Sequence, residues 1–382
     1  MEWKEVTLGD FMQCNPKRTI KKGQKARKIT MDLLIPHSKT IRNWNYEPYS
    51  GGAKFQNGDT IMARITPCLE NGKHAFVSIL NKGEIAYGST EYFVFCGKED
   101  VSDNDFVYYL TKTPLFRDTA IKSMVGSSGR QRAQMDVLEN LKMLVPKDIS
   151  DQRRIASILS SLDRKIELNN KINADLEEMA QTIFKNWFVD FEPFKDGKFV
   201  DSELGMIPEG WKVVKLGDFF PVKTGKKDAN TASVNGKYPF FSCSQNALCT
   251  DSYSFDCDAI LVAGNGDFNV KWYSGKFDAY QRTYVLIPYN KKLLALLYYV
   301  VKRNLLTITS KARGSVIRFI TKGNLTDFEF AIPRDLENNE IVDVFKSINE
   351  KIFANIKENS RLSSLRDTLL PRLMSGELEV PE

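Results

Sequence analysis

An internal repeat limits the folds that this chain can adopt more than any other feature of its sequence. The segment WKEVTLGDF at residues 3–11 returns as WKVVKLGDF at residues 211–219. Further matches follow in the same order: 58–65 with 257–264, 86–95 with 279–287, 106–110 with 296–300, and 140–148 with 327–335. The segments between the matches are shorter overall in the second copy. Two diverged copies of one domain are therefore predicted, and the first copy has the longer loops.

Each copy has the composition of a β-rich domain. Short segments with β-branched and aromatic residues, bounded by Gly, Asn and Asp, predict strands. Four such segments are residues 76–80, 92–96, 259–263 and 284–287. Helical patterns are fewer, and two of them fit buried helices at residues 105–112 and 291–303.

A long helix is predicted after each copy. The first begins near Asp151, a favourable N-cap, and runs to about Asp190, while the second runs from about Asn339 to Met374. Both carry apolar residues at heptad spacing, in the same register, with Ile155 at an a position and Met179 and Leu365 at equivalent d positions. The predicted fold is α+β, with two similar β-rich domains joined by two long central helices in an antiparallel coiled coil with a pseudo-two-fold repeat. The predicted segments are residues 1–150, 151–195, 196–336 and 337–382.

Two polar residues interrupt the heptads at equivalent places in both helices. Asn169 corresponds to Asn355 at an a position, and Lys165 corresponds to Lys351 at a d position. In an antiparallel pair an a residue faces a d residue, so a crossing centred near residue 167 predicts Asn169 against Lys351 and Lys165 against Asn355. Such polar layers fix orientation and register at some cost in stability. The alternative is that these side chains are exposed where the helices splay apart.

The positive charge is concentrated in the two repeated domains. The chain of 382 residues has a formal net charge of +6, and residues 1–150 and 201–335 each carry a net +5. Helices of about 35 residues are about 50 Å long. Two basic domains held by such helices could contact DNA about one helical turn, or about 34 Å, apart. Because the loops of the copies differ, we predict an asymmetric, bipartite DNA site with a fixed gap.

The sequence is poor in catalytic and metal-binding patterns. It has two histidines, His37 and His74, six cysteines without paired ligand spacing, and neither a G-x-x-x-x-G-K-[ST] nor an N-P-P-Y or D-P-P-Y element. Asp59, Glu70 and Lys73 come nearest to a metal nuclease cluster, but their spacing is loose. We therefore predict no catalytic residue and no metal site. No signal peptide or membrane-spanning run is recognised, which favours a cytoplasmic protein.

Several motifs together resemble the specificity subunit of type I restriction-modification systems. They are the paired WK-x-V-x-LGDF segments, DQRRIASILSSLDRKIELNN, NWFVDFEPF, ELGMIPEGW and LLPRLMSGEL, and they cover nearly the whole chain. The resemblance implies two target recognition domains that each read half of a split DNA site, and helices that set their spacing and dock two modification (methyltransferase) subunits. It also implies that S-adenosylmethionine, ATP and Mg²⁺ are bound by modification and restriction subunits, with no cofactor bound by this chain.

Candidate DNA-contacting residues are basic and amide side chains in loops, because these side chains read base edges and bind phosphates. The strongest candidates lie in two segments at equivalent places of the repeat: Arg130, Gln131 and Arg132 in the first, and Lys311, Arg313, Ser315 and Arg318 in the second. Weaker candidates are Arg64, Lys73, Lys271 and Arg282. Lys223, Lys226 and Lys227 are expected to meet phosphates. The alternative for the two loop segments is a solvated surface loop or a helix cap, and the alternative for the other candidates is a solvated surface.

Other features leave alternatives open. The aromatic residues Phe184, Trp187, Phe188, Phe191 and Phe194 form either a docking surface for a modification subunit or a contact between the helix end and the neighbouring domain. The outward helix residues Arg154, Arg164, Asp175 and Arg361 are candidate partner contacts or a solvated face. Two other function classes are a duplicated-domain nuclease or methyltransferase that works alone, and a coiled-coil structural protein without a DNA role.

Overall fold

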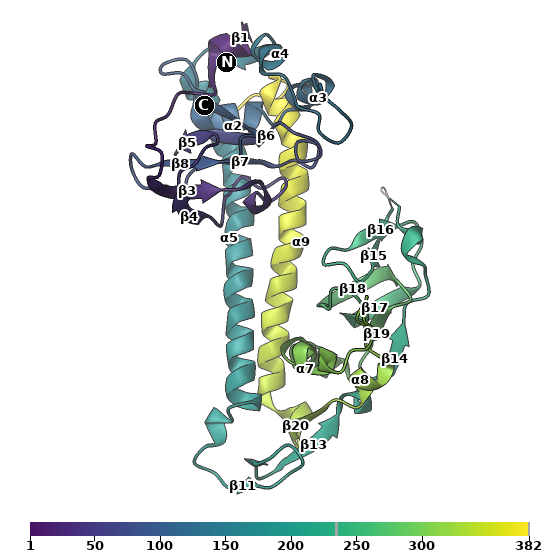
Figure 1. Cartoon of the computed structure of the whole chain (residues 1–382). Coiled ribbons are helices and arrows are strands. Elements are labelled where there is room, and N and C mark those ends of the chain that lie inside the picture. Colours follow the sequence, from purple (N-terminus) through teal and green to yellow (C-terminus); the bar gives the residue numbers. More distant parts are fainter. Residues whose placement is uncertain (234–235, 381–382) are drawn as a thin grey trace. The chain divides into compact units, whose positions relative to one another are not determined.

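The computed structural model describes residues 1–233 and 236–380, and it divides into two compact units (Figure 1). Unit 1 consists of Met1–Asn170 and Ile356–Glu382, and unit 2 of Lys171–Asn355. The two long helices, α5 (Ile149–Phe188) and α9 (Glu340–Met374), each contribute one part to unit 1 and the other part to unit 2. The last two residues of the predicted segment 337–382 lie outside the described residues.

Unit 1 is built on three sheets. A pair of strands, β1 and β10, brings the two ends of the domain together, and two four-stranded sheets follow the orders β2-β9-β6-β7 and β4-β3-β8-β5. The strands are β1 Trp3–Thr7, β2 Met12–Cys14, β3 Lys25–Ile29, β4 Asn45–Pro48, β5 Lys54–Gln56, β6 Thr60–Ala63, β7 His74–Phe76, β8 Ile85–Gly88, β9 Tyr92–Gly97 and β10 Lys142–Pro146. The helices are α1 Leu8–Phe11, η1 Met31–Leu33, α2 Asn104–Leu110, α3 Pro114–Lys122 and α4 Met135–Glu139.

Unit 2 has one six-stranded sheet, in the order β14-β19-β17-β18-β15-β16, and two strand pairs, β11-β12 and β13-β20. The strands are β11 Phe199–Val200, β12 Ile207–Pro208, β13 Trp211–Lys215, β14 Val222–Thr224, β15 Tyr238–Phe241, β16 Leu248–Thr250, β17 Phe255–Ala263, β18 Val270–Ala279, β19 Thr283–Leu286 and β20 Glu329–Pro333. The helices are η2 Glu192–Phe194, η3 Leu216–Asp218, η4 Ala229–Thr231, η5 Lys291–Leu293, α6 Leu294–Arg303, α7 Leu305–Ser310, α8 Lys322–Thr326 and η6 Leu336–Asn338.

The strand pairing of unit 2 repeats that of unit 1. Trp3 pairs with Pro146 in the first closing ladder, and Trp211 pairs with Pro333 in the second. In the sheets, β6 and β9 pair antiparallel as β17 and β19 do, with Ala63 opposite Tyr92 and Ala263 opposite Thr283. The predicted α+β fold with two similar β-rich domains and two long helices is confirmed by this topology.

One predicted strand, at residues 76–80, is wrong. Strand β7 covers His74–Phe76 and ends where residues 76–80 were expected to begin. The apolar pattern is nevertheless satisfied because Val77 is buried. Its backbone amide donates to the carbonyl oxygen of Asp59 at 2.8 Å, and the amide of Leu80 donates to the side chain of Asn57 at 2.9 Å. A neighbouring loop therefore takes the place of a strand as the hydrogen-bond partner.

The long helices lie antiparallel, but the predicted polar pairs are wrong. In unit 1 the Asn169 amide donates to Glu358 at 2.7 Å and to Asn359 at 2.9 Å, and Lys165 forms an ion pair with Glu358 at 3.5 Å. In unit 2 the Asn355 amide donates to Asn173 at 2.8 Å. Asn169 therefore faces Glu358, which lies one heptad after the predicted partner Lys351. The heptad pattern does not distinguish the two registers, because a shift of seven residues leaves it unchanged.

The second buried row of each helix also differs from the predicted d positions. Two d residues, Met179 and Leu365, are 53% and 47% exposed, and Lys351 is exposed as well. The buried positions lie instead four residues after the a positions. They are occupied by residues of different size and polarity, namely Leu159, Ala180, Phe345 and Arg366. The a row was predicted correctly at Ile155, Asn169 and Asn355, which are buried.

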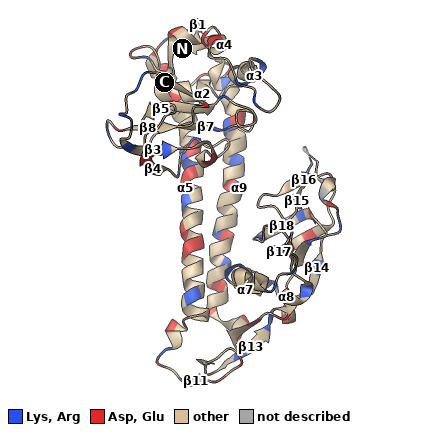
Figure 2. Ribbon diagram, viewed as in Figure 1, with Lys and Arg blue, Asp and Glu red and all other residues tan. Residues whose placement is uncertain are grey.

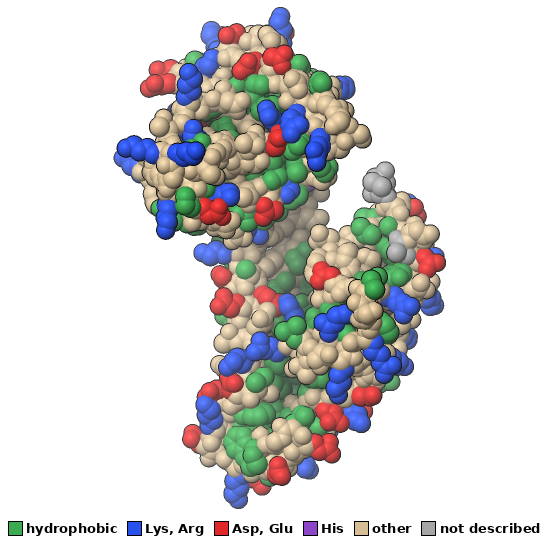
Figure 3. Space-filling view, viewed as in Figure 1, with side chains coloured by type: hydrophobic (Ala, Val, Ile, Leu, Met, Phe, Trp, Pro, Cys, Tyr) green, Lys and Arg blue, Asp and Glu red, His purple; other side chains and the backbone are tan. Residues whose placement is uncertain are grey.

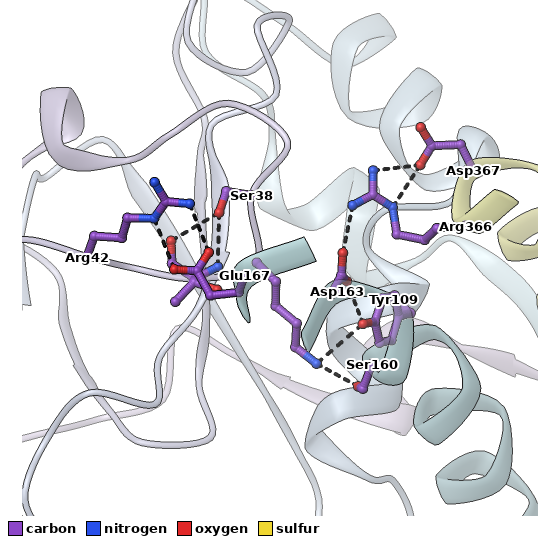
Figure 4. A network of polar contacts seen from close by, with 10 residues as sticks. Ser38, Arg42, Tyr109, Ser160, Asp163, Glu167, Arg366 and Asp367 are labelled. Atoms are coloured by element: carbon purple, nitrogen blue, oxygen red, sulfur yellow. Dashed lines mark hydrogen bonds and ion pairs between the residues drawn. The ribbon is translucent and has the colours of Figure 1, made fainter. Parts of the chain in front are cut away.

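A buried ion pair fixes the helix register in unit 1. The Arg366 guanidinium donates to the Asp163 carboxylate at 2.6 Å, and both side chains are 7% exposed. Asp163 also accepts the hydroxyl of Tyr109 in α2 at 2.6 Å, and Lys39 donates to Ser160 at 2.8 Å (Figure 4). These contacts connect α5 both to α9 and to the β-rich domain at the same position along the helix. A slip of either helix would leave buried charges without partners.

The aromatic residues at the end of α5 pack inside unit 2. Phe184 and Phe188 are buried in its core, and the Phe188 and Phe191 rings meet the Trp211 ring at centroid distances of 5.6 and 5.2 Å. Phe194 contacts Trp211 as well, at 5.1 Å. Of the two alternatives, packing of the helix end against the neighbouring domain is therefore the observed one.

Candidate nucleic-acid interface

The two predicted reading segments form equivalent loops. In unit 1, residues Val125 and Arg132 form an isolated antiparallel bridge, and Arg132 also bridges to Ile65 next to β6. In unit 2, Arg313 and Phe319 bridge in the same way, and Phe319 also bridges to Asn265 next to β17. Each unit therefore presents a short loop, closed at its base on the end of the same strand, with tips at residues 126–131 and 314–318.

In unit 1, Arg64 and Arg132 meet on one carboxylate. Arg132 donates through Nε to both oxygens of Glu91 at 3.0 Å and through Nη2 to Oε1 at 2.8 Å. Arg64 donates through Nε to Oε2 of the same residue at 3.1 Å. The hydrogen bonds from Arg132, followed by those from Arg64, hold the pKa of Glu91 below its usual value. Glu91 therefore stays ionised at neutral pH between two permanent cations.

The tip of the unit 1 loop carries the other two candidates. The Arg130 side chain is exposed, and its backbone amide donates to the carbonyl oxygen of Ser127 at 2.9 Å. The Gln131 carbonyl oxygen accepts the Thr66 amide at 3.0 Å, which holds this part of the loop against the segment after β6. Gly126 has a φ of +135°, where an added Cβ would lie 2.9 Å from the Arg130 carbonyl oxygen. The loop is thus a defined turn that presents an arginine to solvent.

The unit 2 loop has a different chemical character. Lys311, Arg313 and Ser315 are exposed, while Arg318 donates to the carbonyl oxygen of Thr309 at 3.0 Å. Between them lie Val316 and Ile317, which are 93% and 59% exposed. Sequence reasoning missed these two residues because it searched for hydrogen-bonding side chains, although apolar contact with the thymine methyl group is also a form of base recognition.

The weaker candidates are not all free to reach DNA. Lys73 donates its ammonium to the Met31 carbonyl oxygen at 2.6 Å, and Lys271 donates to the Ser244 carbonyl oxygen at 2.7 Å and to Asn269. Burial lowers the pKa of Lys271. By contrast, the side chains of Arg282, Lys223 and Lys226 are exposed, and Lys227 is half-buried. Figure 3 shows Lys and Arg side chains on the visible faces of both units, mixed with acidic side chains.

The outward helix candidates are solvent-facing. Arg164, Asp175 and Arg361 are exposed, and Arg154 forms an ion pair with Asp151 three residues earlier in α5. Figure 2 shows acidic and basic residues at intervals along both long helices. The exposure of Arg164, Asp175 and Arg361 fits a solvated helix surface.

The acidic residues that most resembled a catalytic cluster in the sequence bind other side chains of unit 1. Asp59 is buried and accepts Arg18 at 2.7 Å, while Glu70 accepts the Thr66 hydroxyl at 2.7 Å. His74 is buried against Tyr108, and burial keeps its pKa well below the usual value. Within residues 1–233 and 236–380, no three His, Cys, Asp or Glu side chains are grouped so that they could hold a metal ion. In the same residues, no helix is both long and apolar enough to cross a bilayer.

Comparison with known proteins decides the family. The model of the type I restriction modification DNA specificity domain matches residues 1–178 and 208–362, which cover most of both units. The chain belongs to this specificity family. Its two matched regions correspond to the two copies of the repeat, each with the part of a long helix that follows it.

Individual relatives of this chain are specificity subunits of type I restriction enzymes. The EcoDI specificity subunit of Escherichia coli is 40% identical over 178 residues, which are 46% of this chain and 40% of that protein, so the match spans less than half of either. The MjaIX subunit of Methanocaldococcus jannaschii is 29% identical and covers 73% of this chain and 70% of that protein. The HindI subunit of Haemophilus influenzae is 24% identical over 99% of this chain and all of that protein.

A solved structure shares the fold. The S subunit of a type I restriction-modification system from M. genitalium superposes with a TM-score of 0.53 at 15% identity, covering 98% of this chain and 96% of that one. The specificity chain therefore has the fold of that S subunit over nearly its whole length.

Proposed function

We propose that this chain reads an asymmetric, bipartite DNA site for a type I restriction-modification complex, with one half-site for each unit. The observation that carries the proposal is the equivalent loop in each unit, closed by the same pair of bridges and bearing Arg130 in unit 1 and Arg313 in unit 2. Hydrogen bonding of an arginine or lysine side chain to guanine is the commonest specific contact in the major groove. The surrounding lysines supply sequence-independent contacts to phosphates.

The two half-sites should differ in sequence. The unit 1 loop combines Arg130 and Gln131, whereas the unit 2 loop adds the exposed apolar residues Val316 and Ile317 to Arg313. Guanidinium and amide groups select guanine and adenine by hydrogen bonds, and apolar side chains favour thymine through its methyl group. The two loops are thus closed at equivalent places, while the side chains that would contact the bases differ.

The long helices are proposed to set the gap between the half-sites and to bind two modification subunits. Met179 in unit 2 and Leu365 in unit 1 occupy equivalent heptad positions, and both are about half exposed although they are apolar. Two equivalent apolar side chains on a polar helix surface suit two copies of one partner. The charged residues Arg164, Asp175 and Arg361 would lie at the rim of such contacts.

Catalysis is assigned to partner subunits, which would bind S-adenosylmethionine, ATP and Mg²⁺. The support is that Asp59 and Glu70 are engaged in contacts within unit 1 and that the buried His74 is kept neutral. The competing function is a duplicated-domain enzyme that methylates or cleaves DNA alone. Incubation of the purified chain with DNA, S-adenosylmethionine, ATP and Mg²⁺ separates the two, because only the competing function predicts modified or cleaved DNA.

The proposed function is tested by mapping methylated adenines in the genome with and without the gene. We expect one split motif, with two different halves and a constant gap, to lose its methylation when the gene is deleted. Restoring the gene should restore methylation of the same motif. Unchanged methylation of every motif in a strain whose modification subunit is active would contradict the proposal.

A further inference from the structure

Glu91 lies where three separate segments of unit 1 converge. The register of β6 and β9 places Ala63 opposite Tyr92, so the next residues, Arg64 and Glu91, are neighbours, and the Arg64 amide donates to the Glu91 carbonyl oxygen at 3.0 Å. The loop brings in Arg132 through its bridge with Ile65. The carboxylate thus receives one guanidinium from the sheet and one from the base of the loop.

The contacts extend from Glu91 to the loop tip. Arg132 binds Glu91 through Nε and Nη2, and its Nη1 donates to the Arg130 carbonyl oxygen at 3.1 Å. A guanidinium is planar and rigid, so fixing two of its nitrogens on a carboxylate fixes the direction of the third. The side chain of Glu91 is 20% exposed and that of Arg132 is 40% exposed. Because both are partly buried, water and salt screen this ion pair less than they would a fully exposed pair. The backbone of Arg130 is therefore held indirectly by Glu91.

We propose that Glu91 is a positioning residue that sets the base selectivity of unit 1, because it orients Arg132 and thereby the loop that presents Arg130. This inference rests on the proposed function. Glu91 does not read a base itself, since its two oxygens are occupied by the guanidinium groups of Arg64 and Arg132. One carboxylate between two guanidinium groups also leaves a local excess of one positive charge, which suits a surface that faces phosphates.

Unit 2 lacks the same arrangement at the equivalent positions. The Gly264 amide donates to the Arg282 carbonyl oxygen at 2.8 Å, as the Arg64 amide does to Glu91, so Gly264 and Arg282 stand in their places. Phe319 takes the place of Arg132 in the bridges. A cation, Arg282, is thus present where unit 1 has a carboxylate. The effect of Glu91 should be confined to the half-site of unit 1.

The test is a binding selection with E91Q, which keeps the shape of the side chain and removes its charge. The full chain, co-expressed with a type I modification subunit from the same genome, selects duplexes from a library in which both half-sites are randomised. We expect discrimination among bases in one half-site to fall about 10-fold and the other half-site to be unchanged. Affinity for unrelated DNA should stay equal or rise, because the variant has one more positive charge.

Two further variants keep the test specific. E91D retains the charge and should recover part of the lost discrimination. E84Q removes a carboxylate of similar exposure, 21%, whose partner is Arg27 at 3.2 Å in the same unit, and it should leave both half-sites unchanged. The melting temperature of each variant is measured alongside, because a folding defect would lower it.

Three outcomes would overturn the positioning role of Glu91. They are unchanged selectivity in E91Q, an equal loss in both half-sites, and a loss of affinity for selected and unrelated DNA alike together with a lower melting temperature. Failure of the proposed function gives a different result, since the unaltered chain would then select no sequence in either half-site.

Discussion

Single residues in the two loops differ in chemistry although bridges at equivalent places close both loops. The basic loop residues could be predicted from the sequence, because arginines among small residues stand out. Glu91 could not, since it is 27 residues from Arg64 and 41 residues from Arg132 along the chain. Only the pairing of β6 with β9 and the closure of the loop bring these three side chains together. A residue's type is visible in a sequence, but its partner depends on strand register.

The ammonium of Lys112 gives a residue-scale prediction about stability. It is buried above the Tyr108 ring, 5.5 Å from its centroid, and finds no hydrogen-bond acceptor among the described residues. Burial lowers its pKa to about 8. Lys112→Met should therefore raise the free energy of unfolding at pH 7, by about 1–3 kcal/mol, because it removes an unpaired buried charge.

The pH dependence of this gain identifies its cause. A lysine whose folded-state pKa is about 8 loses its proton in the folded chain before it does so in the unfolded chain, whose ordinary value is 10.5. The penalty is complete below pH 8 and disappears as the pH rises toward 10.5, so the gain from Lys112→Met should shrink over that range in denaturant titrations. Lys122→Met, at an exposed position of α3, is the control and should show no such gain. A gain independent of pH would contradict the electrostatic explanation.

At the scale of elements, the long helices could be predicted nearly to their ends, but their register could not. The first was expected at about residues 151–190 and is Ile149–Phe188, and the second was expected at about residues 339–374 and is Glu340–Met374. Period and caps determine where a helix begins and ends. A slip of seven residues leaves the apolar pattern unchanged, so the register depends on individual polar contacts such as Asp163 with Arg366.

The buried ion pair between Asp163 and Arg366 gives an element-scale prediction. Arg366→Leu should lower the free energy of unfolding by about 3–5 kcal/mol, because the Asp163 carboxylate is left buried without its cation. The double variant Asp163→Leu and Arg366→Leu should recover a large part of this loss. Arg361→Leu, at an exposed arginine in α9 before Arg366, is the matched control and should change stability by less than about 0.5 kcal/mol. Equal losses in the single and double variants, measured by denaturant unfolding, would argue against the ion pair.

At the scale of the whole molecule, duplication explains both what the units share and where they differ. The closing ladders β1-β10 and β13-β20 both begin with a tryptophan opposite a proline, and bridges at equivalent places close both loops, although different residues form those bridges. The residues at the loop tips have diverged. The sequence repeat therefore predicted the architecture and the place of both candidate sites. The chemistry at each site depends on a few side chains that are not repeated.

The central claim is that each unit reads its own half of a split DNA site, and paired single substitutions test it most directly. Arg130→Ala and Arg313→Ala are each introduced into the full chain, co-expressed with a type I modification subunit from the same genome, and the methylated sites are mapped. We expect Arg130→Ala to relax base preference about 10-fold in one half-site and Arg313→Ala to do so in the other. If both variants altered the same half-site, or if neither altered any, the account would be contradicted.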